Sequence, residues 1–399
     1  MPEHMLEPFR VAVPEADLDD LRSRLDRVRW PDELPGAGWD YGVPLSYLKE
    51  LTAYWRNSYD WRKEEERLNR LDQFITMIDG ARVHFYHARS AEPGAVPLLL
   101  LHGWPGSVVE FLDVMGPLTD PVAHGGEAGD AFHVVCPSLP GFAFSGPTPE
   151  RGWHPWRMAH AMCRLMEILG YPRYAAHGTD WGSRIVRDMG LIDPDHLVAV
   201  HTSLLRTPLP AGEDIGRLTD EERDRLGDFD RFNAELSGYM HIQGTRPQTL
   251  AYALSDSPVG QLAWLAEKFK EWTDSENVPE DAVQRDSMLT NVMVYWLTGT
   301  VGSSSRIYYE QVHWEGNDRP DSRLNWNTPQ PSVVPTGVAV SPRELFRSIR
   351  RFGERTDNIV RWTEFERGGH FSGLEVPELL VADLRAFLRD FREALSVPG

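Results

Sequence analysis

The stretch Gly178-Thr179-Asp180-Trp181-Gly182 decides the fold. It follows the apolar run 174–176 and precedes a helical pattern that starts near Trp181. A side chain at the centre of a strained strand-to-helix turn needs small neighbours, and Gly178 and Gly182 provide them. The pattern predicts a nucleophile at Asp180, whose carboxylate is suited to attack a saturated carbon of an epoxide or alkyl halide and form an ester. A helix N-cap is the competing interpretation of this aspartate.

A second motif, His102-Gly103-Trp104-Pro105-Gly106, comes directly after the apolar run 96–101. Such a continuous run is typical of a strand buried on both faces. The loop behind it presents backbone N–H groups toward the elbow, so we expect the N–H groups of Trp104 and Trp181 to form an oxyanion hole. We also expect Trp104, Pro105 and Trp181 to contact the substrate. Alone, the motif is equally compatible with a turn that contains a buried tryptophan.

The acid–base partners come late in the chain. His370, within Gly368-Gly369-His370-Phe371, is the predicted general base, because a neutral imidazole titrates near physiological pH. Glu344 follows the apolar run 338–340 and is the predicted acid that fixes the tautomer of His370. The chain order of nucleophile, acid and histidine agrees with this interpretation. Spacing alone also allows four other acids, which are Glu354, Asp357, Glu364 and Glu366.

Four regions differ in pattern along the chain. Residues 1–75 are charged, rich in tryptophan and helical in spacing, so we expect an N-terminal extension that wraps the core. Residues 76–205 alternate strand and helix patterns, which indicates a parallel sheet. Residues 206–328 are helical, carry no strand run and are interpreted as an inserted cap. Strand and helix patterns resume in residues 329–399 as the second part of the core.

Within the core, residues 74–78 and 83–86 flank Asp79-Gly80, which predicts a hairpin. The runs 133–136 and 197–202 predict further strands, and residues 156–169 predict a helix that ends at Gly170.

Composition excludes several classes of function. The chain has 399 residues and is 41% hydrophobic, which is ample for a large core. The net charge of -19 argues against nucleic acid and anionic membranes as partners. The two cysteines, Cys136 and Cys163, are interpreted as reduced core thiols. No apolar run approaches the ~18 residues of a membrane-spanning helix, and we expect a cytoplasmic protein.

Taken together, these motifs resemble the microsomal-type epoxide hydrolases and their soluble bacterial relatives with an N-terminal extension domain. The resemblance implies an α/β-hydrolase fold, with a mostly parallel sheet, an inserted helical cap and a helical N-terminal extension. It also implies that Asp180 is the nucleophile, His370 the base and Glu344 the orienting acid. The matching stretches are residues 102–107, 136–142, 178–183, 237–243, 255–260, 295–300, 334–337 and 368–371.

The same resemblance implies two cap tyrosines that hold and protonate the epoxide oxygen. By motif these are Tyr239 and Tyr308, and the adjacent Tyr309 is the alternative to Tyr308. A strained ether opens more readily when its oxygen receives a proton, and a phenol donates one without placing a charge in an apolar pocket. From the residues alone, without the family resemblance, either tyrosine is interpreted as an aromatic side chain of the core or of its rim.

The expected partner is a small-molecule epoxide, with no metal and no organic cofactor, and a homodimer agrees with the resemblance. Membrane-bound relatives carry an N-terminal anchor, whereas this chain begins in the extension, so we expect a soluble protein. Bacterial relatives act on xenobiotic epoxides or in natural-product pathways, including enediyne assembly. The cap aromatics point to an apolar or aryl epoxide, or alternatively to packing; they include Trp264, Phe269, Trp272, Tyr295 and Trp296.

Two rival functions stay open at this point. A haloalkane dehalogenase uses the same aspartate with a tryptophan beside it, but halide departure needs indole N–H donors and no proton, so Tyr239 and Tyr308 argue against it. The other rival is a non-catalytic α/β-hydrolase relative that binds a ligand or partner. A structure that holds nucleophile, base and acid out of reach of one another would support that second rival.

Overall fold

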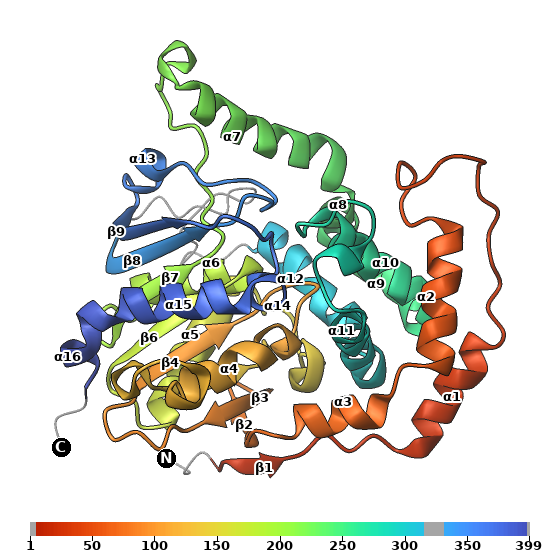
Figure 1. Ribbon diagram of the computed structural model, residues 1–399, viewed down its shortest axis with the longest axis horizontal. Helices are drawn as coiled ribbons and strands as arrows, with labels where there is room; N and C mark the ends of the chain where they lie inside the picture. Colours follow the sequence, from red (N-terminus) through yellow and green to blue (C-terminus); the bar gives the residue numbers. More distant parts are fainter. Residues whose placement is uncertain (1–4, 315–330, 397–399) are drawn as a thin grey trace.

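The computed structural model describes residues 5–314 and 331–396, and these residues contain a nine-stranded sheet with helices on both faces (Figure 1). The strand order is β1-β2-β3-β5-β4-β6-β7-β8-β9. The strands are β1 (Glu7–Phe9), β2 (Gln73–Ile78), β3 (Ala81–Ala88), β4 (Val96–Leu101), β5 (Phe132–Pro137), β6 (Tyr174–Gly178), β7 (Leu197–Thr202), β8 (Ser332–Val340) and β9 (Asp357–Glu364).

The six strands from β5 to β9 in this order are parallel, and β1, β2 and β3 extend the sheet in antiparallel fashion. Leu101, the last residue of β4, lies opposite Gly178, the last residue of β6. Because carboxyl ends of parallel strands share one edge, this register brings residues 102–106 next to the turn at Asp180. Two of the three predicted motifs, the loop at 102–106 and the turn at 178–182, therefore lie at the same edge of the sheet.

Alternate residues of β4 enter two different cores. Leu99 and Leu101 pack on the side of α5 (Pro155–Ile168) and α6 (Asp180–Ile192). Leu98 and Leu100 pack on the other side, in a cluster with residues of α4 (Leu112–Thr119) and α15 (Pro377–Leu388). All four leucines are fully buried, as the continuous apolar run predicts for a strand covered on both faces. The structure confirms the expected α/β class.

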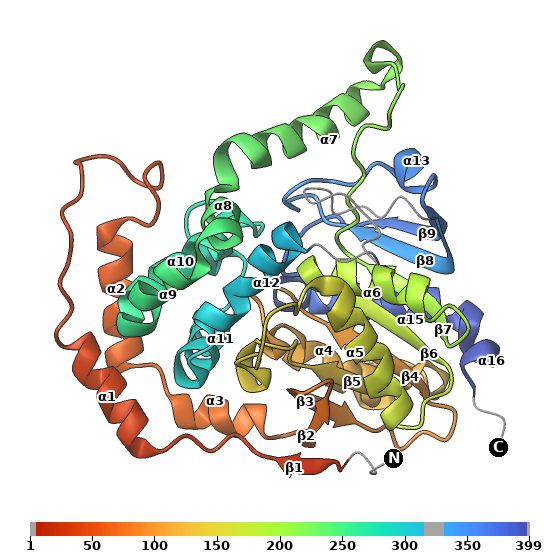
Figure 2. The same ribbon diagram turned by 180° about the vertical axis from the view of Figure 1, so that it is seen from behind.

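The described part of the chain between β7 and β8 contains six α-helices, which form a layer over the site edge of the sheet, visible in green to cyan in Figures 1 and 2. Helix α12 packs against α8 and α9, and α10 packs against α9 and α11. The helices are α7 (Asp220–Arg231), α8 (Gly238–Thr245), α9 (Pro247–Asp256), α10 (Pro258–Glu271), α11 (Arg285–Thr298) and α12 (Val301–His313). The predicted cap boundary at 328/329 lies outside the described residues.

The N-terminal region contacts both the sheet and the cap. Strand β1 pairs with β2 at the sheet edge, although this three-residue strand is too short to show a sequence period. Helices α1 (Glu15–Leu25), α2 (Leu45–Asn57) and α3 (Trp61–Leu68) follow it along the chain, and α1 and α2 both contact α10. Just beyond α2, the hydroxyl group of Tyr59 forms a hydrogen bond of 2.9 Å with the hydroxyl group of Thr290 on α11. The extension therefore braces the cap as well as the core.

The C-terminal part supplies short helices α13 (Arg350–Gly353), α14 (Ser372–Glu375) and α16 (Arg392–Leu395) besides α15. No helix among residues 5–314 and 331–396 combines the length and apolar character needed to cross a membrane.

Candidate active site

The turn between β6 and α6 holds Asp180 in a left-handed backbone conformation, with φ of +46°. Such a conformation costs a non-glycine residue of order 1–3 kcal/mol and persists where the surroundings enforce it. A Cβ at Gly178 would lie 2.2 Å from the carbonyl oxygen of Gly182, and one at Gly182 would lie 2.1 Å from that of Leu101. Both glycines are therefore required by close backbone approach, as the pentapeptide predicted.

The loop after β4 surrounds one oxygen of this carboxylate. The Trp104 N–H donates to Asp180 Oδ1 at 2.7 Å. A Cβ built on Gly103 would lie 2.0 Å from Asp180 Oδ1 and 2.5 Å from the backbone nitrogen of Trp181, so this loop lies in direct contact with the turn. An oxyanion hole formed by the N–H groups of Trp104 and Trp181 stays a prediction.

Helix α11 holds the loop from the cap side, which the sequence did not reveal. Asn291 Nδ2 donates to the carbonyl oxygen of Pro105 at 2.7 Å, and the Tyr295 hydroxyl donates to that of Gly106 at 2.6 Å. Tyr295 is therefore a loop-positioning side chain rather than part of the cavity wall.

His370 connects the two predicted carboxylates. Its Nδ1 lies 2.6 Å from Glu344 Oε1, and its Nε2 lies 3.4 Å from Asp180 Oδ2. The other candidate acids lie elsewhere: Glu354 pairs with Arg350, Asp357 with Arg187 and Glu364 with Arg225, while Glu366 is exposed. The structure thus places Glu344, and none of these four, against the imidazole.

The electrostatics of this group favour a charged imidazole in the resting protein. Burial disfavours the imidazolium, but the carboxylates of Glu344 and Asp180 outweigh it and raise the pKa of His370 well above its usual value. Anything that neutralises Asp180 removes one of these two charges.

Tyr239 from α8 and Tyr308 from α12 lie together near Asp180. Their rings lie 5.6 Å apart, and Tyr239 stacks on Trp104 at 5.1 Å. Tyr308 lies edge-on to Trp181 at 4.9 Å. The Tyr308 hydroxyl is buried at this contact. The adjacent Tyr309 instead stacks on His313 at 3.9 Å.

Both inward tyrosines are held in the neutral form. Burial, and next the Asp180 carboxylate, holds the pKa of Tyr239 well above its usual value. Burial, and next Tyr239 and then Asp180, does the same for the pKa of Tyr308. Neutral phenols that face a carboxylate can donate protons to a group bound between them.

A buried lysine beside Tyr239 was missed from the sequence. Lys268 on α10 is 3% exposed, and its Nζ lies 5.0 Å from the ring centre of Tyr239 and 3.0 Å from Glu271 Oε2. A cation over the face of an aromatic ring is attracted by the ring electrons. Neither the position nor the burial of Lys268 was visible in the helical pattern.

Glu110 is a second buried group that the sequence did not single out. It accepts a hydrogen bond at 3.1 Å from the hydroxyl of Thr179, the residue before Asp180. Burial raises the pKa of Glu110 to about 8. The side chain is therefore a neutral acid at the base of the elbow.

A cavity of about 360 Å³ opens on Asp180 between the cap and the loop after Glu344. Its wall is mostly apolar, with polar groups such as Arg206, Asn233 and Ser237. Trp104, Pro105 and Trp181 are buried behind Asp180 and do not line it, so their part in substrate binding stays a prediction. The apolar lining side chains are Leu204, Phe229, Phe232, Met240, Val312, Leu345 and Phe346, and none belongs to the cap aromatics noted from the sequence.

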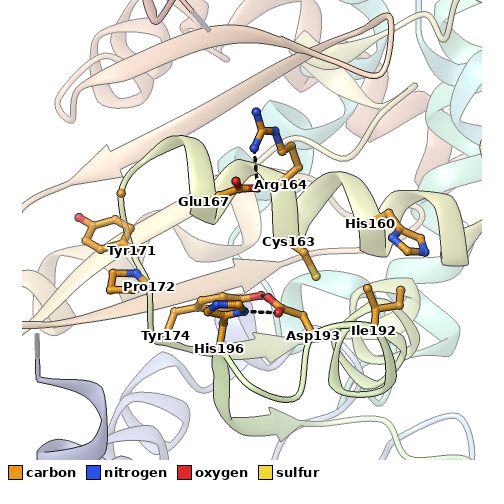
Figure 3. A pocket seen from close by; sticks show the side chains of 11 residues that line it. His160, Cys163, Arg164, Glu167, Tyr171, Pro172, Tyr174, Ile192, Asp193 and His196 are labelled. Atoms are coloured by element: carbon orange, nitrogen blue, oxygen red, sulfur yellow. Dashed lines mark hydrogen bonds and ion pairs between the residues drawn. The ribbon is translucent and has the colours of Figure 1, made fainter. Parts of the chain in front are cut away.

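A second and larger cavity, of about 660 Å³, is lined by residues of α5 and by the segment around the start of β6 (Figure 3). It borders the start of β6, at the amino ends of the parallel strands, whereas ligands of such sheets bind at the carboxyl ends. Its polar side chains engage one another: the Tyr174 hydroxyl donates to Asp193 Oδ2 at 3.0 Å, and His196 also contacts Asp193. Burial raises the pKa of Cys163 in its wall to about 12, so the thiol is unreactive.

No group of three or more His, Cys, Asp or Glu side chains within the described ranges is arranged to hold a metal ion.

Comparison with known proteins agrees with this architecture. Residues 6–111 match the family model described as epoxide hydrolase N terminus, and residues 96–211 match the alpha/beta hydrolase fold model. The chain is 45% identical over 390 residues to a Stigmatella aurantiaca protein whose name assigns it provisionally as an epoxide hydrolase, covering 97% of this chain and 86% of that protein. It is 35% identical over 410 residues to epoxide hydrolase 1 of Sus scrofa, covering 97% and 89%.

A solved structure shows the same likeness in three dimensions. The juvenile hormone epoxide hydrolase of Bombyx mori superposes with a TM-score of 0.89 at 30% identity, over 98% of this chain and 96% of that one.

Proposed function

This chain belongs to the epoxide hydrolase family, and we propose from this premise that it converts an apolar or aryl epoxide to a vicinal diol through a covalent ester on Asp180. The observation that carries the proposal is the position of His370, whose two ring nitrogens face Glu344 and Asp180 at 2.6 and 3.4 Å. A non-catalytic role is disfavoured because these three groups lie within reach of one another.

In the first step, Asp180 Oδ2 attacks an epoxide carbon and the C–O bond breaks. Tyr239 or Tyr308 gives its phenolic proton to the departing oxygen, which becomes the first hydroxyl and leaves a phenolate. The Trp104 N–H holds Oδ1 as the carbonyl oxygen of the new ester. Lys268 stabilises the phenolate formed at Tyr239.

In the second step, ester formation has removed the negative charge of Asp180, so His370 gives up its proton more readily, and the phenolate takes that proton and becomes a neutral phenol again. The neutral imidazole then takes a proton from water, and the hydroxide adds to the ester carbonyl. The tetrahedral oxyanion is stabilised by the N–H groups of Trp104 and Trp181. Collapse expels the diol as an alkoxide, which takes the proton of the new carboxylic acid, so that Asp180 is again a carboxylate and His370 is again protonated as in the resting protein.

The test is a single turnover in heavy-oxygen water. Water attacks the carbonyl carbon, so the first turnover should place an oxygen from Asp180, and none from solvent, in the diol. His370→Gln should accumulate a protein adduct whose mass gain equals that of the epoxide, and Asp180→Ala should form none. Solvent oxygen in the first diol, or no adduct in His370→Gln, would rule out the ester route.

The proposed substrate class follows from the cavity at Asp180. Phe346 contacts Phe229 and Phe232 edge-on, with ring centres 5.5 and 5.6 Å apart, and these rings offer an aromatic wall to a substrate. Screening styrene oxide against short alkyl epoxides for diol formation tests this preference. Detoxification and natural-product synthesis both stay compatible roles, as do a homodimer and a cytoplasmic location.

The rival dehalogenase shares the attack by Asp180. It is disfavoured because Tyr239 and Tyr308 provide protons that a leaving halide does not need. Release of chloride or bromide from haloalkanes at rates comparable to epoxide opening would favour it instead.

A further inference from the structure

The loop that carries the base is attached to the cap by its main chain. We call residues 368–371 the base loop and residues 272–274 the cap segment, which follows α10. The His370 N–H donates to the carbonyl oxygen of Trp272 at 2.8 Å, and the Gly368 N–H donates to Asp274 Oδ2 at 3.0 Å. A Cβ at Gly369 would lie 2.5 Å from the Trp272 carbonyl oxygen, so the two segments are in direct backbone contact.

Glu375, the last residue of α14, closes this contact from the other side. Its Oε1 accepts from the Phe371 N–H at 2.9 Å, and its Oε2 accepts from the Asp274 N–H at 2.8 Å. One carboxylate therefore bridges the residue after the base to the cap segment. Each of the two carboxylate oxygens accepts a hydrogen bond from a main-chain N–H. A glutamine side chain has only one oxygen, so it could keep only one of these two bonds.

The cap segment also contacts the epoxide-opening side of the site. The Trp272 ring lies 5.1 Å from the imidazole of His370 and 5.1 Å from the ring of Tyr239. Tyr239 is held independently on α8, where it stacks on Trp104. The main-chain bonds of Glu375, by contrast, join the base loop to the cap segment.

We propose that Glu375 is a positioning residue that fixes His370 over the ester carbonyl by clamping the base loop to the cap segment. The inference rests on the proposed ester mechanism and adds a residue that acts through His370. Because Asp180 is fixed by the elbow and Tyr239 by α8, the clamp governs hydrolysis of the ester and leaves its formation almost unaffected. A misplacement of about 1 Å in a reacting group can cost about a hundredfold in rate.

The experiment separates the two half-reactions with styrene oxide as the probe. Stopped-flow tryptophan fluorescence follows ester formation, and intact-protein mass follows its decay, in wild type, Glu375→Gln and Glu378→Gln. Glu378 is the matched control because it lies three residues on, is exposed and pairs with Arg367 at the surface. We expect Glu375→Gln to slow ester hydrolysis about tenfold to a hundredfold, to change ester formation less than about threefold, and to accumulate the adduct. Glu378→Gln should match wild type in both steps.

A second variant reports on the other end of the clamp. Asp274→Ala removes the acceptor of the Gly368 N–H and should slow hydrolysis selectively, by less than Glu375→Gln does. Ester that decays at the wild-type rate in Glu375→Gln overturns the clamp alone. Equal losses in both steps, accompanied by a lower Tm in both variants, also overturn it by showing a merely structural role. Absence of any ester in wild type and in His370→Gln overturns the proposed function and the clamp together.

Discussion

The ammonium nitrogen of Lys268 lies 5.0 Å from the ring centre of Tyr239, in a part of the cap where Lys268 is 3% exposed. It also pairs with Glu267 and Glu271, and it lies 5.7 Å from the ring centre of Trp272. A buried cation at this distance interacts weakly with a neutral phenol and strongly with a phenolate. We therefore expect Lys268 to stabilise the phenolate that forms when Tyr239 gives up its proton.

Replacing this lysine tests the idea. Lys268→Met should lower the rate of ester formation about tenfold, which corresponds to about 1.4 kcal/mol, while ester hydrolysis changes little. Stopped-flow fluorescence resolves the two steps. Lys270→Met is the matched control, because Lys270 lies two residues on and faces Trp39 instead. Equal effects of the two substitutions would contradict a role through Tyr239.

The choice between neighbouring tyrosines gives a second prediction. Tyr308 faces Trp181 and Tyr239, whereas Tyr309 stacks on His313. Tyr308→Phe removes one of two proton donors and should slow epoxide opening about a hundredfold, whereas Tyr309→Phe should stay within about twofold of wild type. Single-turnover rates with one epoxide decide the matter. A larger loss in Tyr309→Phe would mean that the register of α12 differs from the structure.

Sequence reasoning succeeded where chemistry and spacing are local. The elbow around Asp180 was readable because two glycines must flank a strained turn, and β4 was readable because six apolar residues run together. His370 stood in a glycine-rich loop. Glu344 could not be separated from four other acids by spacing, and the family resemblance favoured it; in the structure it lies against the imidazole.

The groups that escaped prediction contact the site from distant parts of the chain. Lys268 meets Tyr239 from another cap helix, and Glu110 meets Thr179 across the sheet edge. Such contacts depend on how helices pack, and no period or motif in one segment encodes them. The same holds for the cavity wall, where Phe346 meets Phe232 from more than 100 residues away along the chain. Strand β1 was missed for a different reason, because three residues are too few to show alternation.

The coupling between Asp180 and His370 gives a third prediction, concerning pH. In the resting protein the two carboxylates raise the pKa of His370, so the imidazole should stay protonated at pH values where an ordinary histidine is neutral. Asp180→Asn removes one negative charge and mimics the ester, and it should lower the pKa of His370. An NMR titration of the imidazole ring in both proteins measures the difference, and identical titrations would contradict the coupling. Ester formation also removes the negative charge of Asp180 and should lower the pKa of His370. The ester should therefore decay faster as pH rises through this lowered pKa of His370, because the imidazole becomes neutral and can act as a base.

Glu110 gives a fourth prediction, concerning stability. Burial raises the pKa of its carboxyl from 4.5 to about 8, so the unfolded chain ionises this group at lower pH than the folded protein does. The free energy of unfolding that depends on neutral Glu110 is fully present below about pH 4.5 and is lost as the pH rises toward 8. The loss is about 1.4 kcal/mol per pH unit, or a few kcal/mol in all. Glu110→Gln keeps the shape and cannot ionise. Urea unfolding at about pH 5 and about pH 8 should therefore show the variant gaining stability relative to wild type at the higher pH, since the subtraction cancels every other titrating group. Parallel pH dependence in the two proteins would mean that Glu110 is already ionised in the folded state.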